Sequence, residues 1–307
     1  MRRKNQWLLV AFVILLISNV VLMFSNRATG TIVKTNQFAV ADTTLITRIL
    51  IQGNNEQNTL ERTSGGWQLN GKYSVDRYLR KILFAVLQEV SVRRELSPSE
   101  VSRFWEQLDE RGYEVKLAGV ENAQFHVIGN EKYTRTYFLV DDQEGYEVEI
   151  PGYRDYVGGI FQLTSDQWRN RELFRGSFNS LQSVVIDHQQ GEDLSIEFGD
   201  RFFSVEGVSD LDSGRLVNYL RGFESLQANE IVSAARFVRY DSLSGTVPMA
   251  IVQLVDIAWN RPFELRVFPM LPGERIHLAV AQDGTMAVFQ ASKIQQLLAR
   301  PQDFRSP

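Results

Sequence analysis

Residues 45–71 read "LITRILIQGNNEQNTLERTSGGWQLNG", and this stretch decides the fold class of the 307-residue chain. Short apolar runs alternate with polar turns, and Gly65-Gly66 stands where one run must reverse into "WQLN". Such alternation is typical of antiparallel strands joined by hairpins. The stretch therefore predicts three short strands. Because side chains two residues apart share a strand face, Trp67 and Leu69 are expected on the same side of the sheet.

Two helices and four more strands are predicted to follow. Residues 73–92, "YSVDRYLRKILFAVLQEVSV", place apolar side chains at helical spacing, with Ser74 as the expected N-cap. The capping box "SPSE" at 97–100 begins a second helix, and Gly112 is expected to end it in a left-handed conformation. The strands are expected near residues 113–118, 123–129, 134–140 and 146–150.

The same order of elements returns later in the chain. Residues 181–233 repeat the pattern of residues 45–97, and Phe203 takes the place of Trp67 at a constant offset of 136. Because this position accepts either ring, we interpret Trp67 as a core residue rather than a ligand-stacking one. A weaker match at an offset of 139 relates residues 137–150 to 276–289.

The repeat predicts an α+β protein built of two similar halves, each an antiparallel sheet with one or two packed helices. Each half is expected to end in a short helical stretch with a terminal phenylalanine, at Phe174 and Phe304. The expected divisions are an N-terminal transmembrane helix at 1–26, a juxtamembrane stalk at 27–44, a first repeat at 45–175 and a second repeat at 176–307.

The N-terminal segment carries the signature of a membrane anchor. Three basic residues precede an uncharged run from Trp7 to Phe24, which is long enough to cross a bilayer core as a helix. Basic residues before the run favour a cytoplasmic N-terminus. A cleaved signal peptide is the alternative, but its apolar core is usually shorter and ends at a small-residue site. We therefore expect a single-pass signal anchor with the body outside the cytoplasm.

Charge and cysteine content narrow the classes of function. The formal charge is −4, and it falls to −7 once the basic residues Arg2, Arg3 and Lys4 are set aside. An acidic body disfavours nucleic acid as a partner. The absence of cysteine excludes disulfides, thiolate metal sites and a cysteine nucleophile.

Four stretches of the chain carry a family resemblance: "FAVADTTLITRI" (38–49), "LERTSGGWQLNGKY" (60–73), "EVEIPGYRDYVGGIF" (147–161) and "DQWRNRELF" (166–174). Together with the anchor, stalk and repeat, they resemble an envelope family known as domain of unknown function 4340, in its membrane-anchored Bacteroidetes form. The resemblance covers nearly the whole chain and implies a bacterial cytoplasmic-membrane protein with its body in the periplasm. Some members are encoded near ABC-transporter components of the gliding type, and the family implies no catalytic residues.

No catalytic, metal or cofactor site is predicted. The three histidines, His126, His188 and His277, lie in strand contexts without the spacing of a ligand set. Glu147 and Glu149 alternate on one strand and are expected to face solvent. Paired carboxylates for glycoside hydrolysis would have to face one cleft instead.

The loop "IPGYRDYVGGIF" at 150–161 is the candidate interaction surface. Tyr153, Arg154, Tyr156 and Phe161 give it the aromatic and basic character that is enriched at interface hot spots. The second half lacks both tyrosines and the arginine. The alternative is an insertion that packs on its own half.

The function predicted from these features is that of a non-catalytic, membrane-anchored envelope protein. It would bind another envelope protein as an accessory subunit of an assembly of the ABC-transporter or gliding type. One alternative is a glycan-binding or glycan-cleaving envelope protein that uses the 151–161 loop and nearby acids, and another is a purely structural spacer.

Overall fold

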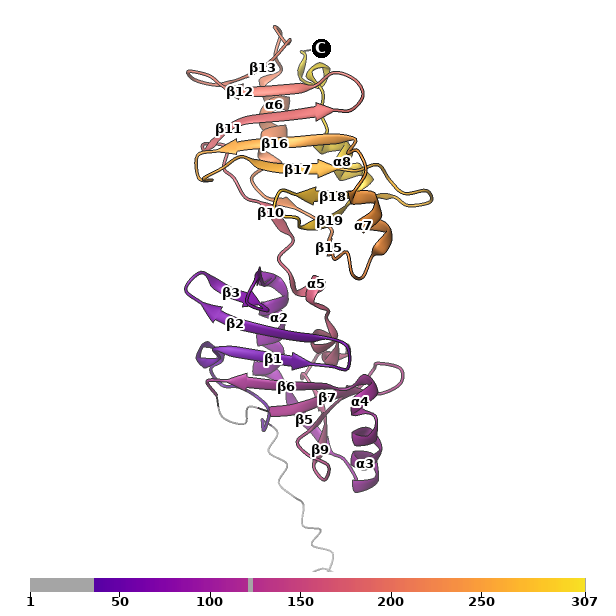
Figure 1. Cartoon of the computed structure of the whole chain (residues 1–307). Helices are drawn as coiled ribbons and strands as arrows, with labels where there is room; N and C mark the ends of the chain where they lie inside the picture. Colours follow the sequence, from indigo (N-terminus) through magenta and orange to yellow (C-terminus); the bar gives the residue numbers. More distant parts are fainter. Residues whose placement is uncertain (1–35, 121–123, 307) are drawn as a thin grey trace, which may run out of the picture.

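The structure is a computed structural model, and it describes residues 36–120 and 124–306. The expected anchor at residues 7–24 lies outside this part of the chain. No helix within the described residues combines the length and apolar character that a membrane crossing needs. The described chain forms two halves stacked end to end, with a narrow waist between them (Figure 1).

The first half contains one antiparallel sheet of nine strands in the order β4-β3-β2-β1-β6-β7-β8-β9-β5. The helices are α2 (Arg77–Glu89), α3 (Pro98–Glu106), α4 (Leu108–Arg111) and α5 (Ser165–Trp168), and two 3-10 turns are η1 (Thr43–Leu45) and η2 (Val157–Gln162). The strands are β1 (Arg48–Gln52), β2 (Gln57–Thr63), β3 (Gly66–Leu69), β4 (Tyr73–Ser74), β5 (Ser91–Glu95), β6 (Tyr113–Ala118), β7 (Gln124–Gly129), β8 (Thr136–Leu139) and β9 (Gly145–Glu149).

The second half contains an antiparallel sheet of eight strands in the order β13-β12-β11-β16-β17-β18-β19-β15. A separate strand pair, β10 (Glu172–Phe174) with β14 (Leu226–Gln227), lies beside it. The helical elements are α6 (Ser213–Arg221), α7 (Val238–Ser244), α8 (Ala291–Leu297) and η3 (Pro301–Phe304). The strands are β11 (Leu181–His188), β12 (Leu194–Phe198), β13 (Phe203–Val205), β15 (Glu230–Val232), β16 (Ala250–Asp256), β17 (Phe263–Val267), β18 (Ile276–Ala281) and β19 (Met286–Gln290).

The two sheets have the same connectivity, from the first hairpin to the edge strand that follows the first helix. The pairing of Leu60 with Leu69 matches that of Ile196 with Val205 at the offset of 136. The later offset of 139 is wrong by two residues. Leu139 pairs with Gly145 and Val280 with Met286, so the offset between equivalent positions there is 141. A slip of two residues keeps every side chain on the correct face, which is why the pattern still matched.

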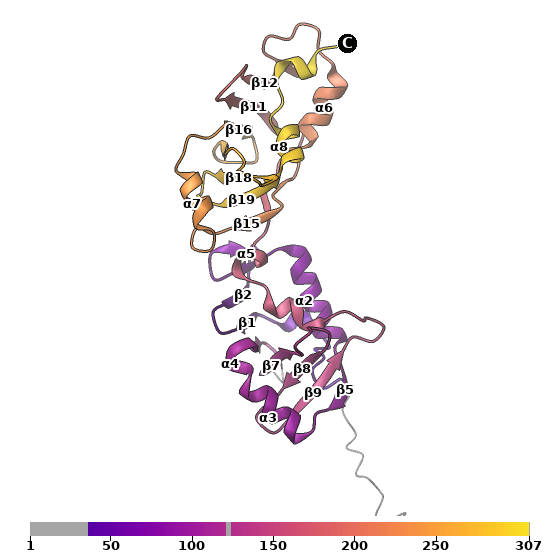
Figure 2. The ribbon, with the colours of Figure 1, turned by 90° about the vertical axis from the view of Figure 1, so that its right-hand side faces the viewer.

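Helices cover both faces of each sheet (Figure 2). In the first half, Phe138 of β8 packs in the core under α2, while its neighbours Tyr137 and Leu139 pack under α3. In the second half, Ala279 of β18 faces the α6–α8 side, and Leu278 faces α7. Successive residues of one strand thus enter different cores, as strand alternation requires.

Asp76, rather than Ser74, caps helix α2. Its carboxylate accepts the backbone N–H groups of Tyr78 at 2.8 Å and Leu79 at 3.1 Å. Asp212 caps α6 in the same way by accepting the N–H of Arg215. Both aspartates satisfy donors that the first helical turn leaves without a partner.

The capping box at Ser97 and Glu100 is present as predicted. Gly112 ends α4 but is extended, with φ of −87°, so the prediction of a left-handed cap is wrong. Its small size is needed for a different reason. A Cβ atom at Gly112 would lie 2.8 Å from the backbone oxygen of Leu108, which is closer than real contacts allow.

Each half is closed by a segment that returns to the start of its first helix. Arg169 forms a β-bridge with Val75, and the N–H of Asp76 donates to the carbonyl of Trp168 at 2.8 Å. In the second half Leu211 bridges Arg305, and the N–H of Asp212 donates to Phe304 at 2.8 Å. The offset between the two sets of residues is again 136.

The equivalent of Phe304 is therefore Trp168, which is fully buried, and not Phe174. Phe174 stacks on Trp259 at 4.9 Å between ring centroids and belongs to the core of the second half. The first half thus closes at Trp168 and Arg169, a few residues before the expected boundary at 175.

Residues 36–44 are part of the first half and not of a free stalk. The ring of Phe38 is 8% exposed and meets Phe125, Phe138 and Tyr146 edge to face. The N–H of Val40 donates to the carbonyl of Leu87. The expectation of a stalk as far as residue 44 is wrong for residues 36–44, because Phe38 packs in the aromatic core of the first half.

Trp67 is a packing residue, as its replacement by Phe203 indicates. Its half-buried ring lies edge-on to Phe84 of α2, with 5.3 Å between ring centroids. Phe203 is 2% exposed at the equivalent position.

Glu147 contradicts the expectation of a solvent-facing carboxylate. It is 3% exposed, and arginines surround it: Arg94 at 2.8 Å, Arg93 at 3.4 Å and Arg135 at 3.8 Å. Arg94 also binds Glu100, and this contact is the main reason that the pKa of Glu100 falls to about 2. A buried carboxylate is tolerated here because cations surround it.

Replacement of the two rival cap residues of α2 separates their roles. We expect Asp76→Ala to lower the free energy of unfolding by about 1–2 kcal/mol, since two helix N–H groups lose their acceptor. Ser74→Ala is the matched control and should have little effect, because Ser74 contributes its backbone carbonyl to Asn170. Urea unfolding of the full-length protein, followed by tryptophan fluorescence, measures both. Equal losses would contradict the assignment of the cap.

Candidate functional site

The predicted surface at residues 150–161 is divided between the core and the solvent. Phe161 is fully buried and lies edge-on to Phe125 and Phe138, so its prediction as an interaction residue is wrong. Tyr156 is half buried; its hydroxyl accepts the side-chain amide of Gln162 at 2.8 Å, and burial raises its pKa. The segment packs on its own half through the buried residues of the turn η2.

Tyr153 and Arg154 remain at the surface. Tyr153 is 53% exposed, and Arg154 beside it is also exposed. Their turn is built on Gly152, whose φ of +82° is one that glycine adopts without strain. Two of the four predicted residues are thus exposed to solvent.

The three histidines lie apart, each on its own strand. The ring of His126 meets Trp105 at 5.0 Å, and burial lowers its pKa. His188 contacts the carbonyl of Ala299 at 3.2 Å, and His277 contacts that of Phe268 at 2.9 Å. Within residues 36–120 and 124–306, no three potential ligand side chains converge on a metal position.

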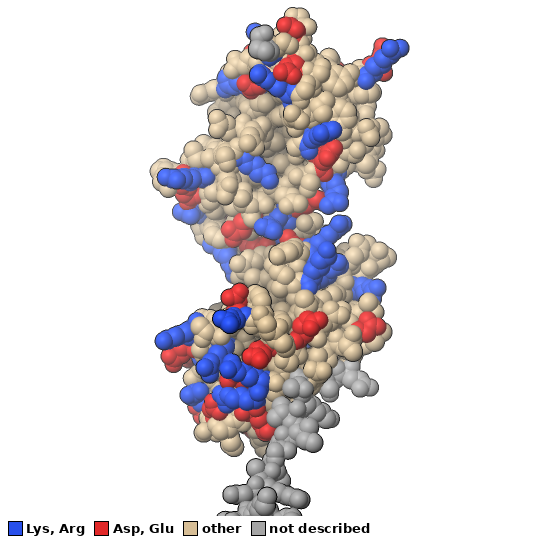
Figure 3. Space-filling model, turned by 180° about the vertical axis from the view of Figure 1, so that it is seen from behind, with Lys and Arg blue, Asp and Glu red and all other residues tan. Residues whose placement is uncertain are grey.

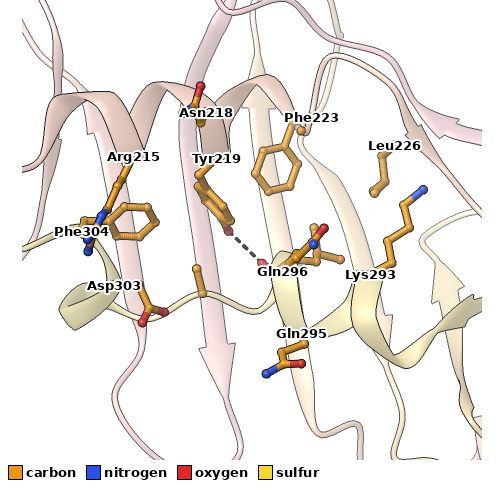
Figure 4. A pocket seen from close by; sticks show the side chains of 13 residues that line it. Arg215, Asn218, Tyr219, Phe223, Leu226, Lys293, Gln295, Gln296, Asp303 and Phe304 are labelled. Carbon is orange, nitrogen blue, oxygen red and sulfur yellow. Dashed lines mark hydrogen bonds between the residues drawn. The ribbon is translucent and has the colours of Figure 1, made fainter.

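A groove lies between helices α6 and α8 in the second half (Figure 4). It has a volume of about 430 Å³, which is within the range of ligand and peptide-anchor pockets. Its floor is apolar. The buried side chains that line it are Phe223, Leu226, Leu297, Ala299 and Phe304.

Tyr219 lies in the groove and connects its two walls, α6 and α8, through a hydrogen bond. Its hydroxyl donates to the carbonyl of Leu297 at 2.9 Å, as the dashed line in Figure 4 marks. Burial raises the pKa of this phenol well above its usual range. The group therefore stays protonated and acts as a hydrogen-bond donor and an aromatic surface.

The rim of the groove is polar and carries cations. Arg215 lies 3.2 Å from the cap residue Asp212, and Lys293 donates to the carbonyl of Gln227. Partial burial lowers the pKa of Lys293. Asn218 and Gln296 stand exposed along the opening. An apolar interior with a hydrogen-bonding rim suits the apolar side chains of a bound segment, whose backbone would meet the rim.

The first half has other side chains at the equivalent positions. At the offset of 136, Tyr219 of α6 corresponds to Leu83 of α2, and Gly222 and Phe223, just after the end of α6, correspond to Val86 and Leu87. The α2 residues are buried under η2, whose apolar side chains belong to the same core: Val157, Ile160 and Phe161. Gly222 thus lines the groove where the first half has the buried Val86, and α8 follows the last strand where the first half has η2.

A second cleft lies in the first half, between α3–α4 and the strands β6 and β7. It has a volume of about 640 Å³. Trp105, Tyr113 and His126 supply rings, and Glu106 and Asp109 supply exposed carboxylates. The Nδ1 atom of His126 is buried there without a hydrogen-bond partner among the described residues.

Neither hollow was predicted from the sequence. Trp105 is half buried and packs against the core under α3. The replacement of Val86 by Gly222 was visible in the aligned halves, but a single glycine does not by itself indicate a groove.

Comparisons with protein-family models, with curated proteins and with solved structures gave no match to this chain. The geometry of the chain's own residues therefore carries the functional argument.

The division of the 150–161 segment has a direct test. Phe161→Ala should lower the free energy of unfolding by about 3–5 kcal/mol, because it opens a cavity in a packed core. Tyr153→Ala should change it by less than about 0.5 kcal/mol, as is usual at exposed positions. Thermal unfolding of the full-length variants provides the comparison. A large loss from Tyr153→Ala would show that this side chain packs.

Proposed function

We propose that this chain is a non-catalytic protein of the bacterial cell envelope that binds another envelope protein. Residues 7–24 would anchor it in the cytoplasmic membrane, and the two halves would extend into the periplasm. The resemblance to domain of unknown function 4340 suggests the role of an accessory subunit in an ABC-transporter or gliding-type assembly.

One observation carries the proposal: the α6–α8 groove has a floor of buried apolar side chains, with exposed polar side chains along its opening. A partner with a short apolar segment would fit this floor. Such a segment would be comparable to η2 of the first half, which buries Phe161, Val157 and Ile160. The partner's apolar side chains would leave water for the groove floor, which is the main source of affinity in such contacts.

The exposed pair Tyr153 and Arg154 offers a second contact for the same partner. Tyrosine and arginine are enriched among residues that dominate interface energies. The pair lies in the other half of the chain, so it would contribute a contact independent of the groove.

A photo-crosslinking amino acid at position 218 tests the groove in native membranes. Asn218 is exposed and lines the opening, while Arg221 is an exposed residue of the same helix outside the lining. We expect one protein species to crosslink from position 218 and not from position 221. Asn218→Trp should block the groove and remove that species from a mild-detergent pull-down, and Arg221→Trp should retain it.

The loop and the groove give separate outcomes. Loss of the partner from Tyr153→Ala or Arg154→Ala, with retention in Asn218→Trp, would place the contact on the loop instead. If position 218 crosslinks to no protein and the tagged chain comes down alone, the binding function is overturned.

The α3–α4 cleft favours glycan binding as a second candidate function. Rings beside carboxylates and amides, here Trp105 and Tyr113 with Glu106, Asp109 and Asn54, can stack on a sugar and accept its hydroxyl hydrogens. We expect soluble peptidoglycan fragments to bind the full-length protein in calorimetry, and Glu106→Gln with Asp109→Asn to weaken them several-fold. The control is Glu89→Gln, at an exposed position of α2. Absence of saturable binding excludes this candidate.

A further inference from the structure

A third hollow, a cleft, lies at the waist between the two halves, separate from the α6–α8 groove and from the α3–α4 cleft. It has a volume of about 290 Å³ and is lined from both halves. Charged side chains gather at this waist (Figure 3). Clefts between structural units are common places for small-ligand sites. The lining residues that matter are Lys72, Tyr73 and Arg169 from the first half, and Trp259, Arg261 and Thr285 from the second.

Two cations share one aromatic ring in this cleft. The guanidinium of Arg169 lies 3.9 Å from the ring centroid of Tyr73, and the ammonium of Lys72 lies 4.9 Å from it. Each contact is favourable in itself. An anion close to this ring would be attracted by both positive charges.

Arg169 is buried and weakly paired. Its residue is 8% exposed, yet its nearest carboxylate, Asp166, lies 3.8 Å away, which is long for a charge-assisted hydrogen bond. The Thr285 hydroxyl accepts a second N–H at 3.1 Å. These are the side-chain acceptors that Arg169 reaches within the described part of the chain, and a guanidinium has five donors to offer. Donors of this buried guanidinium thus remain without a described side-chain acceptor, and Arg169 is one of the residues that line the cleft.

The acids of the cleft are already engaged. Arg175 holds both carboxylate oxygens of Glu172, at 2.8 and 2.7 Å, and lowers its pKa. Asp283 accepts the N–H of Thr285 at 2.9 Å. By contrast, Lys72 and Arg261 form no ion pair with any carboxylate that the structure describes. The lining carries three cations, Lys72, Arg169 and Arg261, against the two carboxylates of Glu172 and Asp283, so a surplus of positive charge remains.

We infer that this cleft binds a small molecule bearing an oxyanion, a phosphate ester or a carboxylate, of about the size of a sugar. Arg169, Lys72 and Arg261 would hold the oxyanion, Thr285 would add a hydroxyl, and the ring of Trp259 would cover the body of the ligand. Because Lys72 and Arg261 come from different halves, the bound ligand would also tie the halves together across the waist.

Calorimetry on the detergent-solubilised full-length protein tests the site, with inorganic phosphate and citrate as separate probes at constant ionic strength. We expect saturable binding of at least one anion. Lys72→Gln and Arg261→Gln should each weaken it about tenfold, since each removes one charge-assisted contact. Both residues are exposed, so folding should be unaffected. Lys81→Gln, at an exposed position of α2, is the matched control and should bind as the unmodified protein does.

The two probes identify the source of the oxyanion. Binding of phosphate alone indicates a phosphate ester, binding of citrate alone indicates a carboxylate, and binding of both indicates recognition of either group. The inference is overturned if neither anion binds saturably, or if Lys81→Gln weakens binding as much as Lys72→Gln does. None of these outcomes depends on the partner groove.

Discussion

The return of the chain to the start of its first helix is the constraint on which each half depends. The segment that follows the last strand of each sheet must be held in place, because its aromatic side chain covers one end of the core. In the first half the fully buried Trp168 seals it, and hydrogen bonds at Asp76 and Asn170 hold the backbone in place. In the second half Phe304 and Ser306 do the same at Asp210 and Asp212. The aspartate at each junction also caps the helix, so helix formation and closure are coupled.

Closure also sets how the two halves meet. The first half is complete at Arg169, and the second begins almost at once with Arg171 and β10. So short a connection keeps the halves adjacent, while their apolar cores remain separate. Polar contacts cross the waist: Arg169 to Thr285, Arg236 to Glu56, and Arg171 to Asp76. Exposed ion pairs each contribute little to the free energy of unfolding, and salt screens them. The apolar cores therefore supply most of the stability, and the charged groups of the waist are available to bind a ligand.

The proposed sites arise where two copies of one scaffold have diverged. Helices α2 and α6 start from the same cap, yet Val86 in one is Gly222 in the other. Leu79 and Ile82 likewise become Arg215 and Asn218, which changes an interior surface into a groove rim. A fold of this class does not itself specify a function, and side chains that differ between equivalent positions are where function is to be sought.

The sequence by itself determined the local elements and the repeat. Strand alternation, the capping box at Ser97 and Glu100, and the offset of 136 between the halves depend on near neighbours, and near neighbours are what a sequence displays. It misplaced Ser74 as the cap because Asp76, two residues on, satisfies the same pattern. It placed the end of the first half at Phe174, because any phenylalanine near a helical stretch fits.

Only the tertiary structure decided which side chains are enclosed. Phe161 and Tyr153 both lie in an aromatic loop, and contacts with Phe125 and Phe138, far away in sequence, bury one and leave the other in solvent. The sequence pattern predicts that Glu147 is a surface carboxylate. In the structure, arginines from a neighbouring strand and a turn surround it. Both clefts and the groove are lined by residues brought together across long stretches of chain. Burial and charge pairing are properties of such distant neighbours, and the periodicity of a sequence records only the near ones.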